Sequence, residues 1–336
     1  MSVLVTGGAG YIGSHVALEL LAQDERVIVL DNFSTGSRAH VPQGAVVVEG
    51  DVRDAAVVTN ILRTYRVNSI MHFAGLIVVP ESVTRPLDYY RHNVQGSISL
   101  IGAAVQEGVP YLIFSSSAAV YGKPLVERVS EALPMQPINP YGMSKAMTEQ
   151  LLQDVSAAHG LRYVALRYFN VAGADPHARS GYGLNKHPTH LVPAAVQAAA
   201  GRLSGFKLYG DDYETADGTC VRDYIHVSDL ACAHVDALRY LAGGGESAAF
   251  NCGYGRGFSV REVLDVVRKR SGKEFEIEIM PRREGDPPVL VADASRIRDV
   301  LGWTPQYDNL DTIVEHELQW LESESRKDMV KAQIRA

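Results

Sequence analysis

The sequence has little of what marks secreted, membrane-spanning or nucleic-acid-binding proteins. Only three cysteines occur in 336 residues, and the spacing of Cys220, Cys232 and Cys252 fits neither a metal site nor a disulfide framework. No run of about 18 apolar residues is present, so we expect no membrane-spanning segment. The formal net charge of −7 argues against a broad basic surface for nucleic acids or anionic membranes. We therefore predict no metal, nucleic-acid or membrane partner.

The amino-terminal end lacks the basic and apolar segments of a secretory signal, so we expect a cytoplasmic location. Hydrophobic residues make up 46% of the chain and charged residues 21%, which is enough apolar material for a full core. The length suits one large domain or two ordinary ones.

A glycine-rich turn follows the first predicted strand, which covers residues 2–6. The turn spans residues 7–13 (GGAGYIG) and leads into a predicted helix over 14–22. Its glycines fit G-x-G-x-x-G or a G-x-x-G-x-x-G variant. A strand, a glycine turn and a helix start let the backbone approach a pyrophosphate closely. We predict a dinucleotide site that includes Gly7, Gly10, Tyr11, Ile12 and Gly13.

An acidic residue ends the second predicted strand, over residues 26–31, where a carboxylate can bind the adenosine ribose. Asp31 would repel a 2′-phosphate, which favours NAD over NADP, although Arg38 lies a little downstream. Asp51, after a third strand over 45–48, could bind the adenine amino group or simply cap the next helix. The remaining candidates around the adenosine are Asn32, Ser34, Thr35, Gly36 and Val52.

Strands and helices alternate through the first half of the chain. Further strands are predicted over 69–73, 111–114 and 163–167, with helices over 55–64 and 86–107. This pattern predicts an α/β fold with a Rossmann-type, doubly wound parallel sheet. Ligands of such sheets bind beyond the carboxyl ends of the strands. Small residues there, Ala74 and Gly75 after Phe73, leave room for a cofactor.

A tyrosine and a lysine four residues apart mark a candidate catalytic helix. Asn139 suits the N-cap and Pro140 the first helical position, and the spacing puts Tyr141 and Lys145 on one helix face. The ammonium would lower the tyrosine pKa from about 10 towards the range of a general base. We expect this helix, the glycine turn and a serine run ending at Ser117 to converge on one edge of the sheet.

The sequence changes character near residue 175. Loops rich in Gly, Pro, His and Asp alternate with short apolar segments, among them predicted helices over 191–200 and 227–242. We predict an NAD-binding domain over residues 1–174 and a smaller α/β substrate domain over 175–336, some segments of which could return to the first sheet. Arg222 and Arg283 either bind a diphosphate or are solvated surface charges. We expect His226 to be a hydrogen-bonded structural residue.

Motifs along almost the whole chain resemble those of the extended short-chain dehydrogenase/reductase family. They cover residues 6–14 (TGGAGYIGS), 72–75 (HFAG), 115–122 (SSSAAVYG), 140–145 (PYGMSK), 166–170 (LRYFN), 218–226 (GTCVRDYIH) and 281–286 (PRREGD). The last three are specific to the sugar-nucleotide epimerase branch of that family.

The resemblance implies bound NAD and C4 epimerisation between UDP-galactose and UDP-glucose through a 4-keto-hexose. It makes Tyr141 the base, Lys145 its electrostatic partner and the anchor of the nicotinamide ribose, and Ser117 a hydrogen-bond partner of the reacting oxygen. It implies a homodimer through the helices near 90–107 and 141–158. Its further cofactor residues are Asn93, Tyr168 and Phe169, and its UDP-sugar residues are Asn170, His190, Leu191, Lys207, Leu208, Tyr209, Arg222, Arg283, Asp286 and Leu290.

Two positions depart from well-studied members of that branch. Ile77 stands where some members carry a lysine near the cofactor. Leu290 stands where some have a tyrosine that closes the pocket against N-acetylated sugars. Because leucine is smaller, we expect some tolerance of UDP-N-acetylhexosamines, and a UDP-xylose substrate also stays open.

Three other functions fit this pattern less well. A sugar-nucleotide 4,6-dehydratase needs an additional acid and base near the serine run, where this chain has Ala118 and Ala119. A non-catalytic NAD-binding regulator has no need of Ser117, Tyr141 and Lys145 together. A simple reductase would exchange its cofactor at every turnover, whereas an epimerase can retain it.

Overall fold

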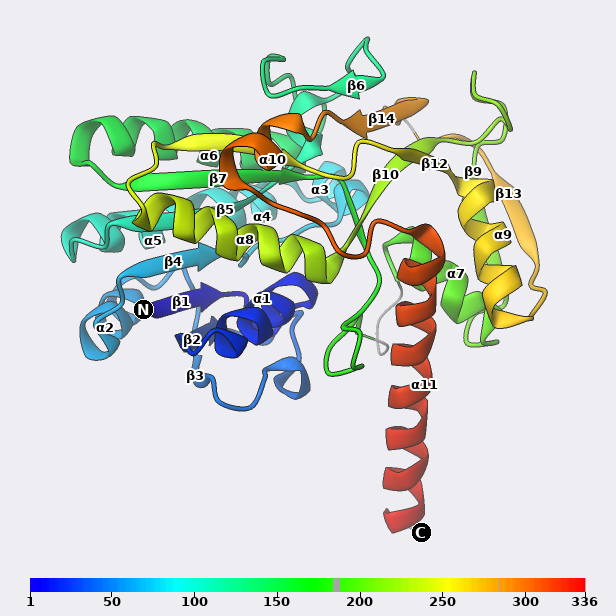
Figure 1. The fold of residues 1–336 in the computed structure, drawn as a ribbon, viewed down its shortest axis with the longest axis horizontal. Coiled ribbons are helices and arrows are strands. Elements are labelled where there is room, and N and C mark those ends of the chain that lie inside the picture. The colour runs from blue at the N-terminus through cyan, green and yellow to red at the C-terminus, as the bar shows by residue number, and fades with distance from the viewer. Residues whose placement is uncertain (184–187, 284, 336) are drawn as a thin grey trace.

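A seven-stranded parallel sheet forms the centre of the computed structural model, which describes residues 1–183, 188–283 and 285–335 (Figure 1). The strand order is β11-β7-β5-β4-β1-β2-β3. The chain leaves the centre in one direction through β2 and β3 and in the other through β4 and β5, so the order reverses between β1 and β4, where such sheets bind ligands. The strands are β1 (Ser2–Thr6), β2 (Arg26–Asp31), β3 (Val46–Glu49), β4 (Ser69–His72), β5 (Tyr111–Ser117), β7 (Arg162–Tyr168) and β11 (Ala248–Cys252).

Helices cover both faces of this sheet because successive strand side chains point to opposite faces. Val3 and Val5 pack in one core with α1 (Tyr11–Ala22) and α8 (Val227–Ala242). Leu4, between them, packs in the other core with α2 (Ala55–Tyr65), α5 (Gly96–Gln106) and α6 (Pro140–His159). The predicted doubly wound α/β fold is confirmed.

Three predicted boundaries were wrong. The helix predicted over 86–107 is divided into α4 (Pro86–Tyr89), a π-helical turn η2 (Tyr90–Gln95) and α5, and α3 (Val79–Thr84) precedes it. The fifth strand continues to Ser117, which pairs in register with Tyr168 of β7. The first helix begins at Tyr11 instead of residue 14, so the last part of the glycine turn is already helical.

A second sheet, of order β12-β10-β14-β6, lies beside the first, and β8 also pairs with β10. It takes β6 (Arg128–Val129) and β8 (Asn170–Ala172) from the first half of the chain, while β11 joins the first sheet. The domain division at residue 174 stays a prediction. The other strands are β9 (Phe206–Tyr209), β10 (Val221–His226), β12 (Gly257–Ser259), β13 (Ile277–Met280) and β14 (Val289–Ala292), with β9 and β13 forming a separate pair.

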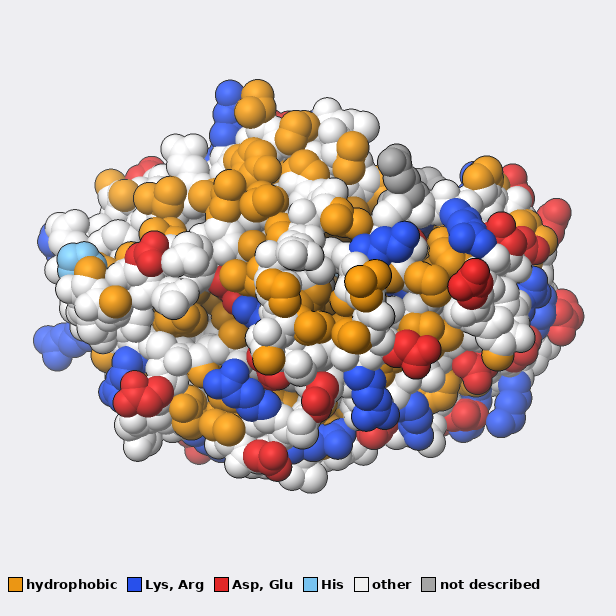
Figure 2. All heavy atoms as spheres, turned by 90° about the horizontal axis from the view of Figure 1, so that it is seen from above, with side chains coloured by type: hydrophobic (Ala, Val, Ile, Leu, Met, Phe, Trp, Pro, Cys, Tyr) orange, Lys and Arg blue, Asp and Glu red, His pale blue; other side chains and the backbone are white. Residues whose placement is uncertain are grey.

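The remaining helices are α7 (Leu191–Ala199), α9 (Val260–Ser271), α10 (Ser295–Leu301), α11 (Leu310–Arg335) and the short 3-10 turns η1 (Arg38–His40) and η3 (Ala118–Tyr121). In Figure 1, α11 extends away from the sheets to the carboxyl terminus. Within the described ranges, every helix is too short or too polar to cross a bilayer. Seen from above, hydrophobic side chains gather over the middle of the molecule and charged ones along its lower margin (Figure 2).

Candidate active site

The glycine turn between β1 and α1 closes so tightly that side chains would not fit. A Cβ at Gly7, whose φ is +71°, would lie 2.7 Å from the backbone nitrogen of Ala74, and one at Gly13 would lie 2.4 Å from the carbonyl oxygen of Gly7. Gly10 is the N-cap of α1 and has no side chain to accept hydrogen bonds from the first N–H groups of the helix. These N–H groups are therefore available to bind an anion. This cradle fits the pyrophosphate of a dinucleotide.

The adenosine side of the cradle is organised by Asp31. Its buried carboxylate accepts hydrogen bonds from the backbone N–H groups of Ala9 (3.0 Å) and Phe33 (2.8 Å), which joins the glycine turn to the loop that begins at Asn32. Arg38 forms an ion pair with Glu49 and lies 4.3 Å from the centre of the Phe33 ring. Because these contacts engage Arg38, they favour NAD over NADP here.

Asp51 does not cap a helix, so that alternative was wrong. Asp54 is the N-cap of α2. Asp51 instead accepts hydrogen bonds from the Arg53 guanidinium at 2.7 Å and 2.8 Å and from the Asn32 amide at 3.0 Å. The Arg53 guanidinium holds the pKa of the Asp51 carboxyl well below its ordinary value. Asp51 and Asn32 therefore lie side by side, and Val52 follows Asp51 in the same loop.

The candidate catalytic residues meet where β5 ends and α6 begins. Asn139 caps α6 by accepting a 2.8 Å hydrogen bond from the Gly142 N–H, and Pro140 is the first helical residue, as predicted. A Cβ at Gly142 would lie 2.5 Å from the carbonyl oxygen of Ala119. The glycine thus lets the helix start against the serine run, where the Ser117 side chain is close enough to Tyr141 to influence its pKa.

Lys145 lies one turn further along α6 and is only 4% exposed. Its ammonium donates a 2.8 Å hydrogen bond to the carbonyl oxygen of Ser115 and lies 5.8 Å from the centre of the Tyr141 ring. The three predicted catalytic side chains therefore lie close together in this structure.

We predicted a lowered pKa for Tyr141, but in this structure its pKa is raised. Burial raises the pKa of Tyr141 above its ordinary value, and the hydrogen bond from Ser117 opposes only part of that effect. Burial also lowers the pKa of Lys145 to about 8, against the opposing charge of Glu149. The spacing of Tyr141 and Lys145 in the motif carries no information about how deeply the two groups are buried.

Aromatic side chains line the sheet edge beside this group. Phe73 follows β4, Tyr168 ends β7, and both rings contact His234 of α8, at 4.8 Å and 5.6 Å between ring centres. Asn93, in the π-helical turn, is tied to the backbone of Leu76 by two hydrogen bonds of 2.8 Å and 3.0 Å. Sequence reasoning missed His234, for which the motifs held no signal.

The candidate diphosphate residues gather around the start of β14. Arg222 is 9% exposed, and its guanidinium lies 3.6 Å from the Asp286 carboxylate. Arg283 lies 4.0 Å from the centre of the Tyr209 ring, and the Asp286 N–H donates to the Arg283 carbonyl oxygen. Arg222 is therefore not a solvated surface charge. Glu284, in the same motif, lies outside the described residues.

Leu290 connects this group to the catalytic edge. It pairs in register with Arg222 and packs against the apolar cluster of η3, which includes Val120 and Tyr121. Asn170 pairs with Tyr224 further along β10. The predicted substrate residues on the second sheet thus reach the segment that directly follows Ser117.

Several predicted residues have other surroundings. Lys207 is exposed and lies 3.9 Å from Glu278, whereas Leu208 is 1% exposed in the core and offers a ligand no surface in this structure. His190 precedes Leu191, the first residue of α7, and its ring contacts Tyr11. Ile77 is half exposed. His226 is hydrogen-bonded to His316 and to the Ser228 N–H, as expected of a structural residue.

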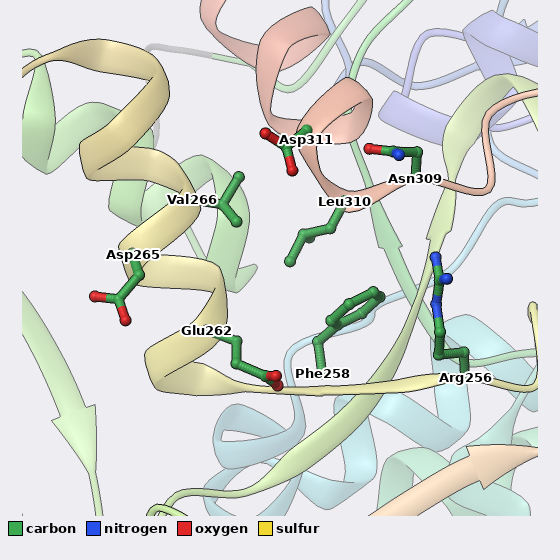
Figure 3. Close-up of a pocket in the computed structure, with 8 residues that line it drawn as sticks. All are labelled: Arg256, Phe258, Glu262, Asp265, Val266, Asn309, Leu310 and Asp311. Carbon is green, nitrogen blue, oxygen red and sulfur yellow. The ribbon is translucent and has the colours of Figure 1, made fainter.

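A pocket of about 390 Å³ lies away from these residues, between α9 and the start of α11 (Figure 3). Phe258 and Leu310 form its apolar floor. Its charged groups already have partners, since Arg256 pairs with Asp308 and Asp311 pairs with Arg270. Within the described residues, no cluster of His, Cys, Asp and Glu is arranged to hold a metal.

Comparisons with known proteins match the chain over nearly its full length. The model of the NAD dependent epimerase/dehydratase family matches residues 3–253. The UDP-glucose 4-epimerase of Azospirillum brasilense is 54% identical, over 95% of this chain and 91% of that protein. The crystal structure of UDP-glucose 4-epimerase from Brucella ovis in complex with NAD superposes with a TM-score of 0.92 at 45% identity, covering 95% of this chain and 97% of that one. The UDP-Glc/GlcNAc 4-epimerase of Campylobacter jejuni superposes with a TM-score of 0.84 at 43% identity, covering 96% and 99%.

Proposed function

We propose that this chain, which belongs to the NAD dependent epimerase/dehydratase family, interconverts UDP-galactose and UDP-glucose by inverting C4 of the hexose. The observation that carries the proposal is the meeting of Ser117, Tyr141 and Lys145 beside a dinucleotide cradle. Its similarity to UDP-glucose 4-epimerases supports the substrate pair.

The chemistry requires a redox step, because the C4 hydrogen of a hexose is not acidic and a base alone cannot invert that carbon. NAD+ held by the glycine turn and Asp31 would supply an acceptor for the C4 hydride and, once reduced, a donor for it, so no external oxidant is needed. Since there is no net oxidation, the cofactor need not leave between turnovers.

Tyr141 is the proposed base for the O4 proton. The structure raises its pKa by burial, so its anion needs support from nearby charge, and Lys145 is the cation placed to give it. Ser117, at the end of a hydrogen-bonded strand, would hold the reacting oxygen against Tyr141. Such fixed positioning contributes to catalysis because the reacting groups need no further ordering.

Arg222 and Arg283 are the proposed diphosphate ligands, with Asn170 beside them. Guanidinium groups bind phosphate oxygens through paired hydrogen bonds. A diphosphate held on the second sheet would keep the keto sugar in the site while the hexose rotates to present its other face to the cofactor. This division allows rotation of the sugar without release.

A 4,6-dehydratase reaction is disfavoured by the segment after Ser117. Ala118 and Ala119 form the start of η3, and the Ala119 N–H donates to the Ser117 hydroxyl. Neither alanine can donate or accept a proton for the elimination of water.

Leu290 favours a second activity on the same mechanism, C4 epimerisation of UDP-N-acetylglucosamine. Its side chain packs against η3 directly after the serine run, where a larger residue would reduce the space near the sugar. The C. jejuni enzyme, which carries both sugars in its name, shares this overall structure.

A second copy of the chain is the proposed partner, through the face formed by α3, α4, α5 and α6. These helices pack together and expose five large apolar side chains by 38–65%: Val79, Val83, Leu87, Ile98 and Met147. An uncovered apolar surface of this kind is typical of an interface. Light scattering after gel filtration should give a dimer for wild type and a monomer for Leu87→Asp, with Leu125→Asp, an exposed residue elsewhere, as control. A monomeric wild type would contradict the proposal.

The direct test uses protein as purified, with no added NAD. UDP-galactose is supplied, and UDP-glucose formation is followed with a coupled dehydrogenase. We expect turnover by resident cofactor that survives gel filtration. Turnover that depends on NAD(P)H in stoichiometric amount would support the reductase alternative, and no turnover with either UDP-hexose or its N-acetylated form would contradict an epimerase.

A further inference from the structure

A buried ionic network lies directly behind the proposed catalytic residues. Glu149 of α6 and Arg167 of β7 are 5% and 6% exposed. The Arg167 guanidinium donates to the Glu149 carboxylate at 2.6 Å, 3.0 Å and 3.1 Å. The Ser116 hydroxyl donates to the same carboxylate. Both charged groups are therefore held in one geometry.

The network continues from Arg167 into the second sheet. The guanidinium also donates to the Tyr121 hydroxyl at 2.9 Å, and that hydroxyl donates to the Asn251 side chain at 2.7 Å. Asn251 in turn donates to the Val129 carbonyl oxygen in β6. A buried ion pair is weak evidence for stability, since an apolar pair of similar size often serves as well. Its position next to the catalytic helix suggests another use.

Lys145 needs a counter-charge, because a buried ammonium is costly without one. Its hydrogen bond goes to the Ser115 carbonyl oxygen, and its other close contact is the Phe114 ring, 5.0 Å away. Glu149 follows Lys145 by four residues, so the two side chains share one helix face. Its charge raises the pKa of Lys145, against the larger lowering caused by burial.

The other titratable groups that face Lys145 cannot supply that charge. Tyr141 on the same helix has a raised pKa and is neutral until it gives up its proton. His72 of β4 is buried and neutral, with its pKa lowered to about 3. Arg167 of β7 is itself a cation. Among these described neighbours, the negative charge comes from Glu149.

The register between β5 and β7 also connects Glu149 to the strand that carries the serine run. Ser116 pairs with Arg167 between β5 and β7, and the Glu149 carboxylate joins both side chains. Ser116 stands between Ser115, whose carbonyl oxygen accepts from Lys145, and Ser117, whose side chain is close to Tyr141. Holding Ser116 therefore fixes the acceptor of the lysine and the partner of the tyrosine together.

We propose that Glu149 is a positioning residue for the reaction: clamped by Arg167 and Ser116, its carboxylate is the buried counter-charge that keeps Lys145 protonated and directed at the end of β5. The inference rests on the proposed role of Lys145 in epimerisation. It assigns Arg167 to the clamp, without contact with the reacting sugar.

The test measures the pKa of Lys145 directly, by NMR of protein carrying 13C-labelled lysine side chains, with Lys145→Arg to identify the signal. Glu149→Gln removes the negative charge alone. The double variant Glu149→Gln with Arg167→Gln leaves neither buried charge without its partner, and it replaces the single variant if that one does not fold. We expect the pKa of Lys145 to fall by about 1 to 3 pH units in Glu149→Gln, and by less in the double variant, because loss of the Arg167 cation acts in the opposite direction. Asp154→Asn makes the same charge change as Glu149→Gln at an exposed site of α6 and should leave the pKa of Lys145 unchanged.

The activity profile provides the second readout. A lower pKa of Lys145 should move the basic limb of the kcat profile to lower pH by the same amount, with KM little changed. An unchanged Lys145 pKa in folded Glu149→Gln, or a raised one in the double variant, would overturn the inference. A lowered Lys145 pKa without movement of the basic limb would support the role of Glu149 and contradict the proposed role of Lys145.

Discussion

The two sides of the candidate site are built differently. Ser117, Tyr141 and Lys145 stand on a strand end and a helix start, and hydrogen bonds within the central sheet fix their places. Arg222, Arg283 and Asp286 lie on the second sheet and the loop before β14, and Arg283 is exposed. Proton and hydride transfer require a fixed geometry, whereas a flexible diphosphate can be held by long charged side chains. The first side should therefore control kcat and the second KM.

The largest effect should come from Tyr141→Phe. Removing the hydroxyl takes away the base, and a positioned acid or base contributes about 10²- to 10⁴-fold. We expect kcat to fall by that amount while KM for UDP-galactose stays within about threefold, because the diphosphate contacts remain. Tyr65→Phe, at the end of α2, is the matched control. A normal kcat in Tyr141→Phe would contradict the role of Tyr141 as the base.

Arg222→Met and Arg283→Met should act on the opposite parameter. Each hydrogen bond to a charged group is worth about 1.5 to 3 kcal/mol, so we expect KM to rise by about 10- to 100-fold with kcat largely retained. Arg282→Met is the control, because Arg282 lies next to Arg283 in the same turn but its guanidinium is already paired with the Asp212 carboxylate, 2.6 Å away. Loss of kcat at unchanged KM would break the division between the two sides.

Leu290→Tyr should have the smallest effect and change selectivity. The larger ring should exclude an N-acetyl group more than a hydroxyl, and a steric difference in a pocket of this kind is worth about 1 to 3 kcal/mol. We expect the ratio of kcat/KM for UDP-N-acetylglucosamine to that for UDP-glucose to fall by about tenfold. Leu290→Met, similar in volume, should leave the ratio unchanged. An equal loss for both substrates would argue against a role in selectivity.

The sequence predicted best those features that depend on neighbours in the chain. The glycine turn, the cap at Asn139 and the helix that carries Tyr141 and Lys145 are all local patterns, and each is confirmed. The alternation of strands and helices was sufficient for the class of sheet.

Features that depend on distant partners were missed. The break at Asn93 involves hydrogen bonds to Leu76, which no helix periodicity contains. The clamp on Glu149 joins two elements whose register only the folded sheet defines. The raised pKa of Tyr141 reflects burial, and a motif carries no information about solvent exposure.

The most direct test of the account follows the hydrogen at C4. UDP-galactose deuterated at C4 would be converted in ordinary water by the protein as purified, and the UDP-glucose formed analysed by NMR and mass spectrometry. Transfer within the site, as proposed, predicts that the product retains its deuterium at C4. Replacement of the deuterium by solvent hydrogen would contradict the mechanism, because it would show that the carbon is inverted by exchange with water.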